Sequence, residues 1–536
     1  MLKLNNQWAL VLILFIALLV SCNHRLVVNQ QQYSEQHRPQ WHFSPPQKWM
    51  NDPNGMFFYD GVYHLFYQHY PGASVWGPMH WGHAMSKDLV HWENLPIALF
   101  PDSLGYIFSG SAVVDWKNTS GLGSAANPPL VAIFTIHDMV AQKAGSKSCE
   151  SQGIAFSLDK GMTWTKYARN PVLPNPGNIP DFRDPKVIWH PESNQWIMAV
   201  AAGDQISFWG SKNLINWNHL SDFGQDLGAH DGVWECPDLF PVKVEGSDLV
   251  KWVLIVNLNP GGPNGGSGTQ YFVGTFDGKR FTPDSSFVPF TPKGTGVWLD
   301  YGRDNYAGVT WSDIPSADGR RILIGWMSNW DYSNNVPTEV WRNAATLPRT
   351  LTLHHTKHGY RLFSNPVNEL KSIRKRETDW AFSAIKKDQV MVPKLSFSPS
   401  QSEWELELEL ANGAAGTYWL ELSNSLGERY RVGYDASTGQ LISDRQKAGP
   451  NQFSDRFSNS FHVAPVHLDG QKVRLRLLFD VSSLEAFAEN GATVMTELFF
   501  PTTPFTSAKI ISEGTGLLSV KGKTWQLARI WPKSSR

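Results

Sequence analysis

Three acidic residues in the first half of the chain, Asp52, Asp184 and Glu235, lie next to a proline or one residue away from it. Each precedes an apolar strand, a turn and a second strand, although the three segments are otherwise unlike each other. Equivalent positions in repeated units become neighbours when the units are arranged around an axis. A repeat architecture would therefore gather three carboxyl groups at one place, as the hydrolysis of a glycosidic bond requires.

The neighbours of two of these acids favour different tasks. Asp52 lies between Asn51 and Asn54, whose amides can donate hydrogen bonds and lower the pKa of a carboxyl group. An ionised Asp52 suits a nucleophile. Glu235 lies in the apolar run VWECP, which favours the protonated form that an acid/base catalyst needs.

The third acid, Asp184, follows Arg183, which would keep the Asp184 carboxyl group charged. A charged Asp184 would be a poor proton donor but a good anchor for sugar hydroxyls or for developing positive charge. Each acid also has a structural interpretation, because Asp-Pro-Asn-Gly is a favourable turn and Arg-Asp pairs are usually structural. Three such sites in register in successive units favour the catalytic interpretation.

The segment that must position these acids reads as all-β. Residues 41–365 show short apolar runs broken by Asp-Gly, Asn-Pro and Gly-rich turns, with little helical periodicity. A five-unit ring closes on itself and leaves only short, protected strand edges. The sequence therefore predicts a five-bladed β-propeller, and its inner strands are expected to start near Asp52, Ser109, Asp184, Glu235 and Asp304.

A second domain follows the predicted propeller of residues 41–365. Residues 366–378 are more polar, are compatible with a short helix and are predicted to form a linker. Residues 379–536 alternate between apolar and polar side chains in the manner of strands. The simplest architecture for this part is an antiparallel β-sandwich.

The amino terminus carries signals for export. Residues 1–21 contain Lys3 and an apolar core that is short for a membrane span but right for a signal peptide. The sequence LVSC that ends at Cys22 resembles a bacterial lipobox, so we expect an acylated Cys22 and a membrane-anchored lipoprotein. An ordinary secretory signal that ends near a chance cysteine is the alternative. Residues 22–40 would then form a polar tether.

Composition and charge limit the classes of ligand that the protein can be expected to bind. The net charge of −1 and the pI of about 7.0 show no electrostatic footprint for nucleic acid, so the expected ligand is neutral. Cys149 and Cys236 are the remaining cysteines, and a disulfide framework is not expected. His80 and His83 lack a nearby acidic third ligand, and the Gly-rich run 261–268 lacks the Lys-Ser/Thr ending of a phosphate loop. We expect neither a metal nor a cofactor.

The chain resembles glycoside hydrolase family 32, the invertases, inulinases and levanases that act on β-fructofuranosides. The resemblance begins at residues 42–55, HFSPPQKWMNDPNG, and covers most of residues 41–365. Residues 479–491, FDVSSLEAFAENG, resemble a segment of the carboxy-terminal sandwich of the family. Other family-like segments follow in the expected order: FYQHYP, WGPMHWGHA, FSGS, FRDPKV and WECPDLF.

This resemblance implies a retaining double displacement with Asp52 as nucleophile, Glu235 as acid/base and Asp184 as stabiliser of the transition state. Trp330 is equally compatible with an aromatic wall of the sugar subsite and with the core. The other substrate contacts that we predict are Trp49, Asn51, Gln68, Trp76, Phe108, Ser109 and Arg183.

The resulting hypothesis is an exo-acting enzyme that releases terminal fructose from levan or inulin and from sucrose. Two alternatives stay open at this point. A fructosyltransferase would use the same covalent intermediate with a sugar as acceptor in place of water. A surface lipoprotein without catalysis would only hold fructan for uptake. The linkage preference and the oligomeric state are not predicted.

Overall fold

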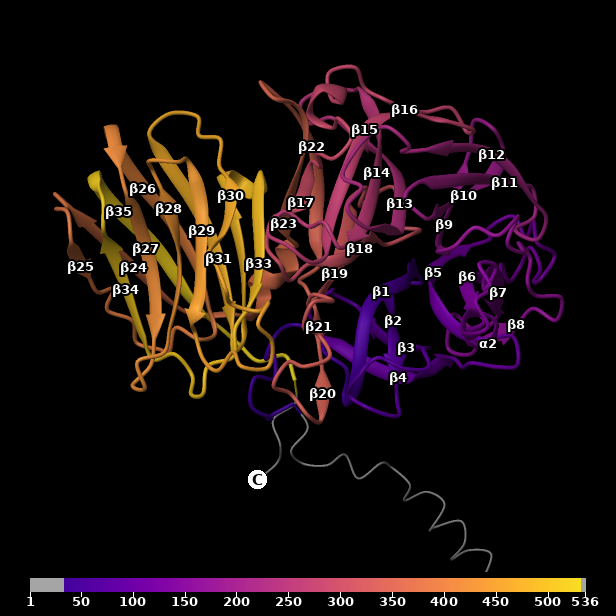
Figure 1. Ribbon diagram of the computed structural model, residues 1–536, viewed down its shortest axis with the longest axis horizontal. Helices are drawn as coiled ribbons and strands as arrows, with labels where there is room; N and C mark the ends of the chain where they lie inside the picture. The colour runs from indigo at the N-terminus through magenta and orange to yellow at the C-terminus, as the bar shows by residue number, and fades with distance from the viewer. Residues whose placement is uncertain (1–32, 532–536) are drawn as a thin grey trace, which may run out of the picture.

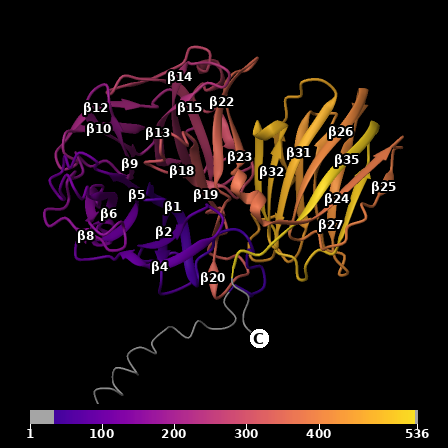
Figure 2. The same cartoon turned by 180° about the vertical axis from the view of Figure 1, so that it is seen from behind.

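The computed structural model describes residues 33–531, in which two all-β parts lie side by side (Figure 1). The first part contains five sheets, and the second contains two sheets of six strands each. The predicted order, a five-bladed propeller followed by a β-sandwich, is confirmed. Viewed from behind, the two parts have the same side-by-side arrangement (Figure 2).

The first two blades are built from the amino-terminal third of the described chain, apart from one short strand. In the first blade, β20 (Trp341–Arg342) pairs in parallel with β1 (Lys48–Tyr59), which is followed outward by β2 (Val62–Tyr70), β3 (His80–Ser86) and β4 (Trp92–Leu99). The second blade consists of β5 (Tyr106–Val114), β6 (Leu130–His137), β7 (Glu150–Ser157) and β8 (Thr165–Lys166). The short helix α2 (Met139–Lys143) lies in the connection between β6 and β7.

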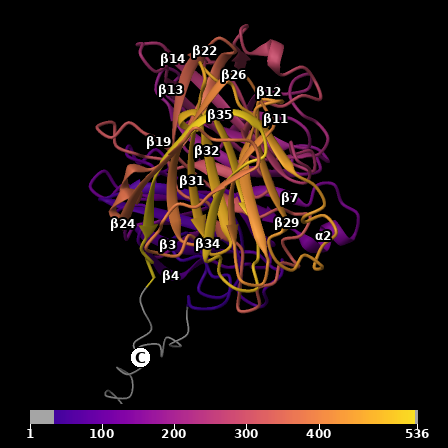
Figure 3. The ribbon, with the colours of Figure 1, turned by 90° about the vertical axis from the view of Figure 1, so that its left-hand side faces the viewer.

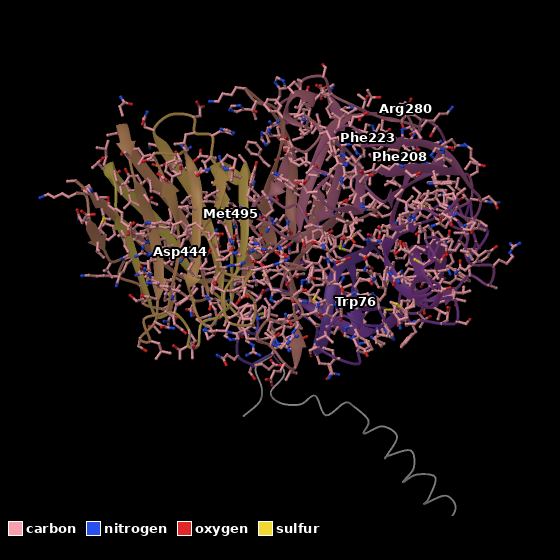
Figure 4. The ribbon with its side chains drawn as sticks, viewed as in Figure 1. Trp76, Phe208, Phe223, Arg280, Asp444 and Met495 are labelled. Carbon is pink, nitrogen blue, oxygen red and sulfur yellow. The ribbon has the colours of Figure 1, made fainter. Side chains whose placement is uncertain are left out.

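The third blade consists of β9 (Phe182–His190), β10 (Gln195–Ala202), β11 (Ile206–Ser211) and β12 (Trp217–Phe223). The fourth consists of β13 (Val233–Lys243), β14 (Val250–Asn259), β15 (Gly268–Phe276) and β16 (Phe281–Pro283), and β17 (Trp298–Asp300) also pairs with β15. The 3₁₀ helix η1 (Val288–Phe290) follows β16. Phe208 and Phe223 of the third blade pack in one apolar cluster with strands of the fourth (Figure 4).

The fifth blade consists of β18 (Tyr306–Thr310), β19 (Arg321–Met327), β22 (Arg349–Thr356) and β23 (Gly359–Pro366), and β21 (Ala344–Ala345) also pairs with β19. The inner strands β1, β5, β9, β13 and β18 contact each other in sequence, and β18 contacts β1 again. This ring of contacts closes the propeller. Closure protects the inner strand edges, which would otherwise offer unpaired backbone groups.

The sandwich packs one six-stranded sheet on the other (Figure 3). One sheet runs in the order β24 (Arg374–Ser383), β35 (Thr515–Leu527), β26 (Ser402–Ala415), β31 (Lys472–Asp480), β32 (Ser483–Ala488) and β33 (Thr493–Leu498). The other runs in the order β25 (Gln389–Met391), β34 (Ser507–Ser512), β27 (Thr417–Ser423), β28 (Arg429–Asp435), β29 (Gln440–Lys447) and β30 (His462–Pro465). In β26, Leu406 and Leu408 are buried between the sheets, whereas the alternating residues Glu405 and Glu407 point away from the core.

The connection between the two parts is shorter than the predicted linker of residues 366–378. The 3₁₀ helix η2 (Asn368–Ile373) follows β23, and strand β24 begins at Arg374. Residues 374–378 therefore belong to the sandwich sheet, because strand β24 pairs with β35. Within the sandwich, a further 3₁₀ helix, η3 (Glu489–Gly491), joins β32 to β33.

Buried ion pairs join the propeller to the sandwich. The guanidinium group of Arg349, which is fully buried, donates to Asp300 at 2.8 Å and to Glu485 of the sandwich at 2.6 Å. Burial opposes ionisation of Glu485, but Arg349 and His42 outweigh burial and lower its pKa. These charges are buried together, so removal of one partner would leave the others uncompensated.

The end of the predicted tether is part of the folded protein. Tyr33 stacks on Trp531 with ring centroids 3.9 Å apart, and the fully buried Arg38 donates to the carbonyl oxygen of Pro45 at 2.7 Å. Residues 33–40 are therefore not a free tether, which the polar composition alone had suggested. The predicted signal peptide of residues 1–21 and the lipidation site Cys22 lie outside the described residues.

Candidate active site

A cavity of about 390 Å³ opens at one end of the propeller axis and contains all three predicted acids. Trp76, which lies in the first blade, is one of its aromatic walls (Figure 4). The lining residues are Asn51, Asp52, Gln68, Trp76, Phe108, Ser109, His137, Gln142, Glu150, Asp181, Arg183, Asp184, Glu235, Trp330 and Asn334. Trp330 therefore belongs to the wall of the cavity.

One predicted contact does not line the cavity. Trp49 is fully buried, and its indole N–H donates to Asn51 Oδ1 at 2.7 Å. Trp49 is thus one layer behind the cavity wall, where it fixes the orientation of the Asn51 amide. The sequence placed Trp49 close to the acids, but the direction of its side chain depends on the local path of β1.

The backbone explains why each acid stands next to a proline or one residue away from it. The pairing of β1 with β2 is irregular between Met50 and Pro53, and that of β13 with β14 between Glu235 and Asp238. The pairing of β9 with β10 is irregular opposite Asp184 as well. A bulge turns side chains away from the regular alternation. Proline cannot donate a hydrogen bond to a strand ladder, so it is tolerated at a bulge, where the ladder is already interrupted. The same irregularity in three inner strands directs the three carboxyl groups toward the axis.

Asp52 is held by two side-chain donors. Asn51 Nδ2 donates to Asp52 Oδ1 at 2.9 Å, and Ser109 Oγ of the second blade donates to Asp52 Oδ2 at 3.0 Å. Asn54 instead donates to the backbone oxygen of Asp52 at 3.1 Å. Burial, together with the nearby charge of Glu235, raises the pKa of Asp52, and the donors Asn51 and Ser109 only reduce this rise. The prediction of a lowered pKa is therefore wrong, because burial outweighs the hydrogen bonds.

Arg183 pairs with a different acid from the one predicted. Its Nη2 donates to Glu235 Oε1 at 2.7 Å, whereas its Nε is 4.0 Å from Asp184 Oδ2. Glu150, at 3.4 Å, and Asp181 also contact the guanidinium group. Arg183 therefore orients the Glu235 carboxyl group in the cavity wall.

The environment of Glu235 is polar and not apolar as predicted. In addition to Arg183, the hydroxyl group of Tyr306 from β18 donates to Glu235 Oε2. Both carboxylate oxygens of Glu235 thus accept a hydrogen bond from a group on another blade. Such fixed partners hold a catalytic carboxyl group in one orientation.

Asp184 is buried between the other two acids. Burial raises its pKa to about 8; Arg183 opposes this rise, and the charges of Glu235 and Asp52 add to it. The backbone N–H of Cys236 donates to Asp184 Oδ2 at 3.1 Å. Arg183 thus favours the charged form as predicted, but burial and the two neighbouring acids outweigh it.

The side chain of Cys236 lies beneath the acids, behind the wall of the cavity. Its Sγ lies 3.5 Å from Asp184 Oδ2 and 3.7 Å from Asp52 Oδ2. These two distances show how closely the ring of blades brings together acids that are far apart in the sequence. Cys236 and Cys149 are unpaired, and within residues 33–531 no group of His, Cys, Asp and Glu side chains has an arrangement that could hold a metal.

Sequence reasoning missed a polar cluster on the rim of the cavity. The His137 ring stacks on Phe108 with centroids 4.2 Å apart, and its Nδ1 lies 3.0 Å from Glu150 Oε1. His137 and Glu150 are opposite each other where the apolar strand β6 ends and β7 begins. Polar residues at matched ends of two apolar strands were the signal that could have revealed them. Gln142 lies in the short helix α2, Asp181 and Asn334 lie in turns, and none of the three gave such a signal.

A closed ring of five blades with three carboxyl groups at its axis, beside a β-sandwich, is an architecture suited to a glycosidase. Family models lead to the same class. The glycosyl hydrolases family 32 N-terminal domain matches residues 42–366, and the family 32 C-terminal domain matches residues 369–532. The chain belongs to glycosyl hydrolase family 32 and is a glycosidase.

Several relatives are similar over nearly the full chain. A levanase of Bacillus subtilis (strain 168) is 44% identical over 523 residues, which cover 97% of this chain and 75% of the levanase. An extracellular exo-inulinase of Aspergillus niger is 38% identical over 524 residues, which cover 93% of this chain and 96% of the inulinase.

Solved structures of related proteins are similar to this chain over nearly its full length. The crystal structure of an exo-inulinase from Aspergillus awamori has a TM-score of 0.84 and 36% identity, and the match covers 93% of this chain and all of that one. A fructofuranosidase from Schwanniomyces occidentalis complexed with fructose has a TM-score of 0.80 and 32% identity, and the match covers 94% of this chain and all of that one.

Within residues 33–531, no helix has the length and apolar character needed to cross a membrane.

Proposed function

We propose that the protein is a retaining, exo-acting β-fructofuranosidase that releases terminal fructose from fructans and from sucrose. The observation that carries this proposal is the meeting of Asp52, Asp184 and Glu235 in one cavity at the propeller axis. The names of its relatives, levanase, exo-inulinase and fructofuranosidase, support this substrate class.

In the first step, a carboxylate oxygen of Asp52 attacks the anomeric carbon of the terminal fructose. The bond to the leaving oxygen breaks, and Glu235 supplies the proton that this oxygen takes up. Asn51 and Ser109 donate to the Asp52 carboxylate and hold it for attack. Arg183 and Tyr306 hold Glu235 in position for the proton transfer.

In the second step, Glu235 takes a proton from a water molecule, and the resulting hydroxide attacks the same carbon. The bond to Asp52 breaks, fructose leaves with retained configuration, and both carboxyl groups return to their starting states. Asp184 would contact fructose hydroxyl groups. With a pKa of about 8, its carboxyl group can donate a hydrogen bond to a hydroxyl oxygen as well as accept one.

The shape of the cavity favours terminal residues. Cys236 lies directly beneath Asp52 and Asp184, which form the inner end of the cavity. The space below the acids is a separate cavity of about 10 Å³, which is too small for a sugar. A fructan chain therefore cannot pass along the propeller axis beyond the acids, which supports a pocket that takes the last residue of a chain.

The test is a time course of products from sucrose, inulin and levan with the purified protein, and Glu235→Gln as the control variant. Fructose released from both polymers without intermediate oligomers supports exo action, and the rates rank the linkages. We expect Glu235→Gln to lose about 10²- to 10⁴-fold in rate. A ladder of oligomers would contradict exo action. Less free fructose than glucose from sucrose would indicate transfer to a sugar acceptor.

We also propose that the protein is exported and anchored by a lipid on Cys22. The sequence LVSC after an apolar segment supports this proposal. Cys22→Ala should move the protein from the membrane fraction to the soluble fraction, whereas Cys149→Ala should leave it in the membrane fraction. Membrane association of Cys22→Ala would contradict the lipid anchor.

A further inference from the structure

A second cavity, of about 480 Å³, lies at the opposite end of the propeller axis from the acids. Its residues include Ile188 of β9 and Phe240 of β13, which follow Asp184 and Glu235 along the same strands. Because a strand advances about 3.3 Å per residue, Ile188 lies about 13 Å further along β9 than Asp184. The two cavities thus open at the two ends of the same ring of inner strands.

The two cavities do not form one site. Between them lies the cavity of about 10 Å³ lined by Ser111, Lys186 and Cys236. A space of this size accommodates about one water molecule and no sugar ring. A ligand in the far cavity would therefore bind independently of the catalytic pocket.

Trp116 at the rim of the far cavity is 59% exposed, which is unusual for so large an apolar side chain. Its indole N–H already donates to Asp313 Oδ1 at 3.0 Å. Since the N–H is the only polar atom of an indole, further contacts are left to the ring face. The following turn is fixed as well, because Asp115 accepts hydrogen bonds from the N–H groups of Thr119 and Ser120, both at 2.8 Å.

Other side chains complete a mostly aromatic wall with a few polar groups. Trp189 and Trp252 are half-buried in it. Arg321 donates from Nε to the carbonyl oxygen of Pro241 at 2.9 Å, and its Nη groups have no hydrogen-bond partner among the described residues. Ser312 Oγ is buried and also lacks a partner within residues 33–531. The cavity therefore offers ring faces and free donors together.

The charges around this cavity balance. Lys117 and Arg321 are matched by Glu192 and Asp313. The remaining cation, Lys186, lies 3.2 Å from the buried Asp238. Balanced charge gives no preference for an anion or a cation. Ring faces with a few convergent polar groups, in a cavity within the range of about 300–1,000 Å³ typical of ligand sites, suit a neutral saccharide.

We propose that this cavity, with Trp116 as its main contact, binds a segment of a neutral fructan chain at a distance from the catalytic pocket. The choice of fructan rests on the proposed function, because fructan is the polymer that the enzyme would consume. A second attachment point keeps the polymer near the enzyme between cleavage events and raises its effective concentration. The site should therefore affect hydrolysis of polymers and not of sucrose.

The test compares Glu235→Gln with the double variant Glu235→Gln/Trp116→Ala by native gel electrophoresis in gels that contain levan or inulin. The Glu235→Gln background prevents digestion of the polymer. We expect Trp116→Ala to weaken the retardation by polymer about tenfold. The matched control is Phe461→Ala in the same background, because Phe461 is 49% exposed and lies in the sandwich. Equal retardation of the Trp116 variant and its parent would overturn the proposal.

Kinetics separate this proposal from the proposed function. In the active protein, Trp116→Ala should leave kcat/KM for sucrose within about twofold and raise KM for levan or inulin. A loss of sucrose hydrolysis in this variant would show that Trp116 acts through the catalytic pocket, against the proposal. If the unmodified protein hydrolyses neither sucrose nor fructan, the proposed function fails, while retardation still reports on the far cavity. Self-association that Trp116→Ala abolishes, with fructan retardation unchanged, would identify a second copy as the occupant and overturn the proposal.

Discussion

Replacement of Ser109 by Ala tests how the site keeps a buried nucleophile ionised. The Ser109 hydroxyl group donates to Asp52 Oδ2 at 3.0 Å, and Asn51 Nδ2 is the second side-chain donor to this carboxyl group. A hydrogen bond to a charged group contributes about 1.5–3 kcal/mol. One pKa unit corresponds to about 1.4 kcal/mol, so loss of this bond should raise the pKa of Asp52 further, by about one to two units.

The sign of the effect follows from the role of Asp52. A nucleophile must be ionised, so a higher pKa moves the acid limb of the kcat/KM profile to higher pH by about one to two units. Initial rates of sucrose hydrolysis across the acid and neutral range measure this shift. The alkaline limb of the profile should stay in place.

Ser111→Ala is the matched control because Ser111 lies on the same strand and does not contact Asp52. Its Oγ donates to the carbonyl oxygen of Pro185 and accepts from the N–H of Val187, both at 2.9 Å. Ser111→Ala should therefore leave the acid limb unchanged. An unchanged acid limb in Ser109→Ala would refute the reasoning, since Ser109 would then not tune the Asp52 carboxyl group.

Three further predictions concern the supporting structure. Trp49→Phe removes the N–H that holds Asn51 and should lower kcat/KM for sucrose about two- to tenfold; an unchanged kcat/KM would argue against this positioning role. Arg349→Met should cost about 3–5 kcal/mol in the free energy of unfolding measured with denaturant, because it leaves buried carboxylates unpaired. The exposed pair of Arg456 should contribute no more than about 1 kcal/mol, so Arg456→Met is the control, and equal losses would contradict the argument. The folded-state pKa of Glu485 lies below its unfolded value of about 4.3. Its contribution to the free energy of unfolding should therefore be complete above that pH and should be lost as the pH falls through the folded-state pKa. Glu485→Gln should flatten this part of the plot of unfolding free energy against pH.

The repeating pattern in the sequence was enough to predict the architecture. Acids within two residues of a following proline, Asp52, Asp184 and Glu235, marked the same irregular position in three inner strands. This worked because a bulge and its proline are local features, which a short segment encodes by itself. Strict alternation in the sandwich, as in β26, is also local and predicted strands in the same way.

Pairings between blades were decided only by the tertiary structure. The sequence suggested that Arg183 would pair with its neighbour Asp184, yet it donates to Glu235, which is 52 residues away. Which acid meets a guanidinium group depends on the angle between blades and on side-chain direction, and neither is encoded in spacing. The pKa of Asp52 was likewise predicted in the wrong direction, because the depth of burial is a property of the closed ring.

The sequence by itself therefore determined the types of the catalytic groups, their repeated position and the all-β architecture, since these follow from local backbone preferences. The closed propeller decided which groups touch, how deeply they are buried and where a cavity remains. Trp49 and Trp116 show the difference. Trp49 lies in the most recognisable motif yet is buried behind the cavity wall, whereas Trp116 lies in no motif and presents its ring at the far end of the axis.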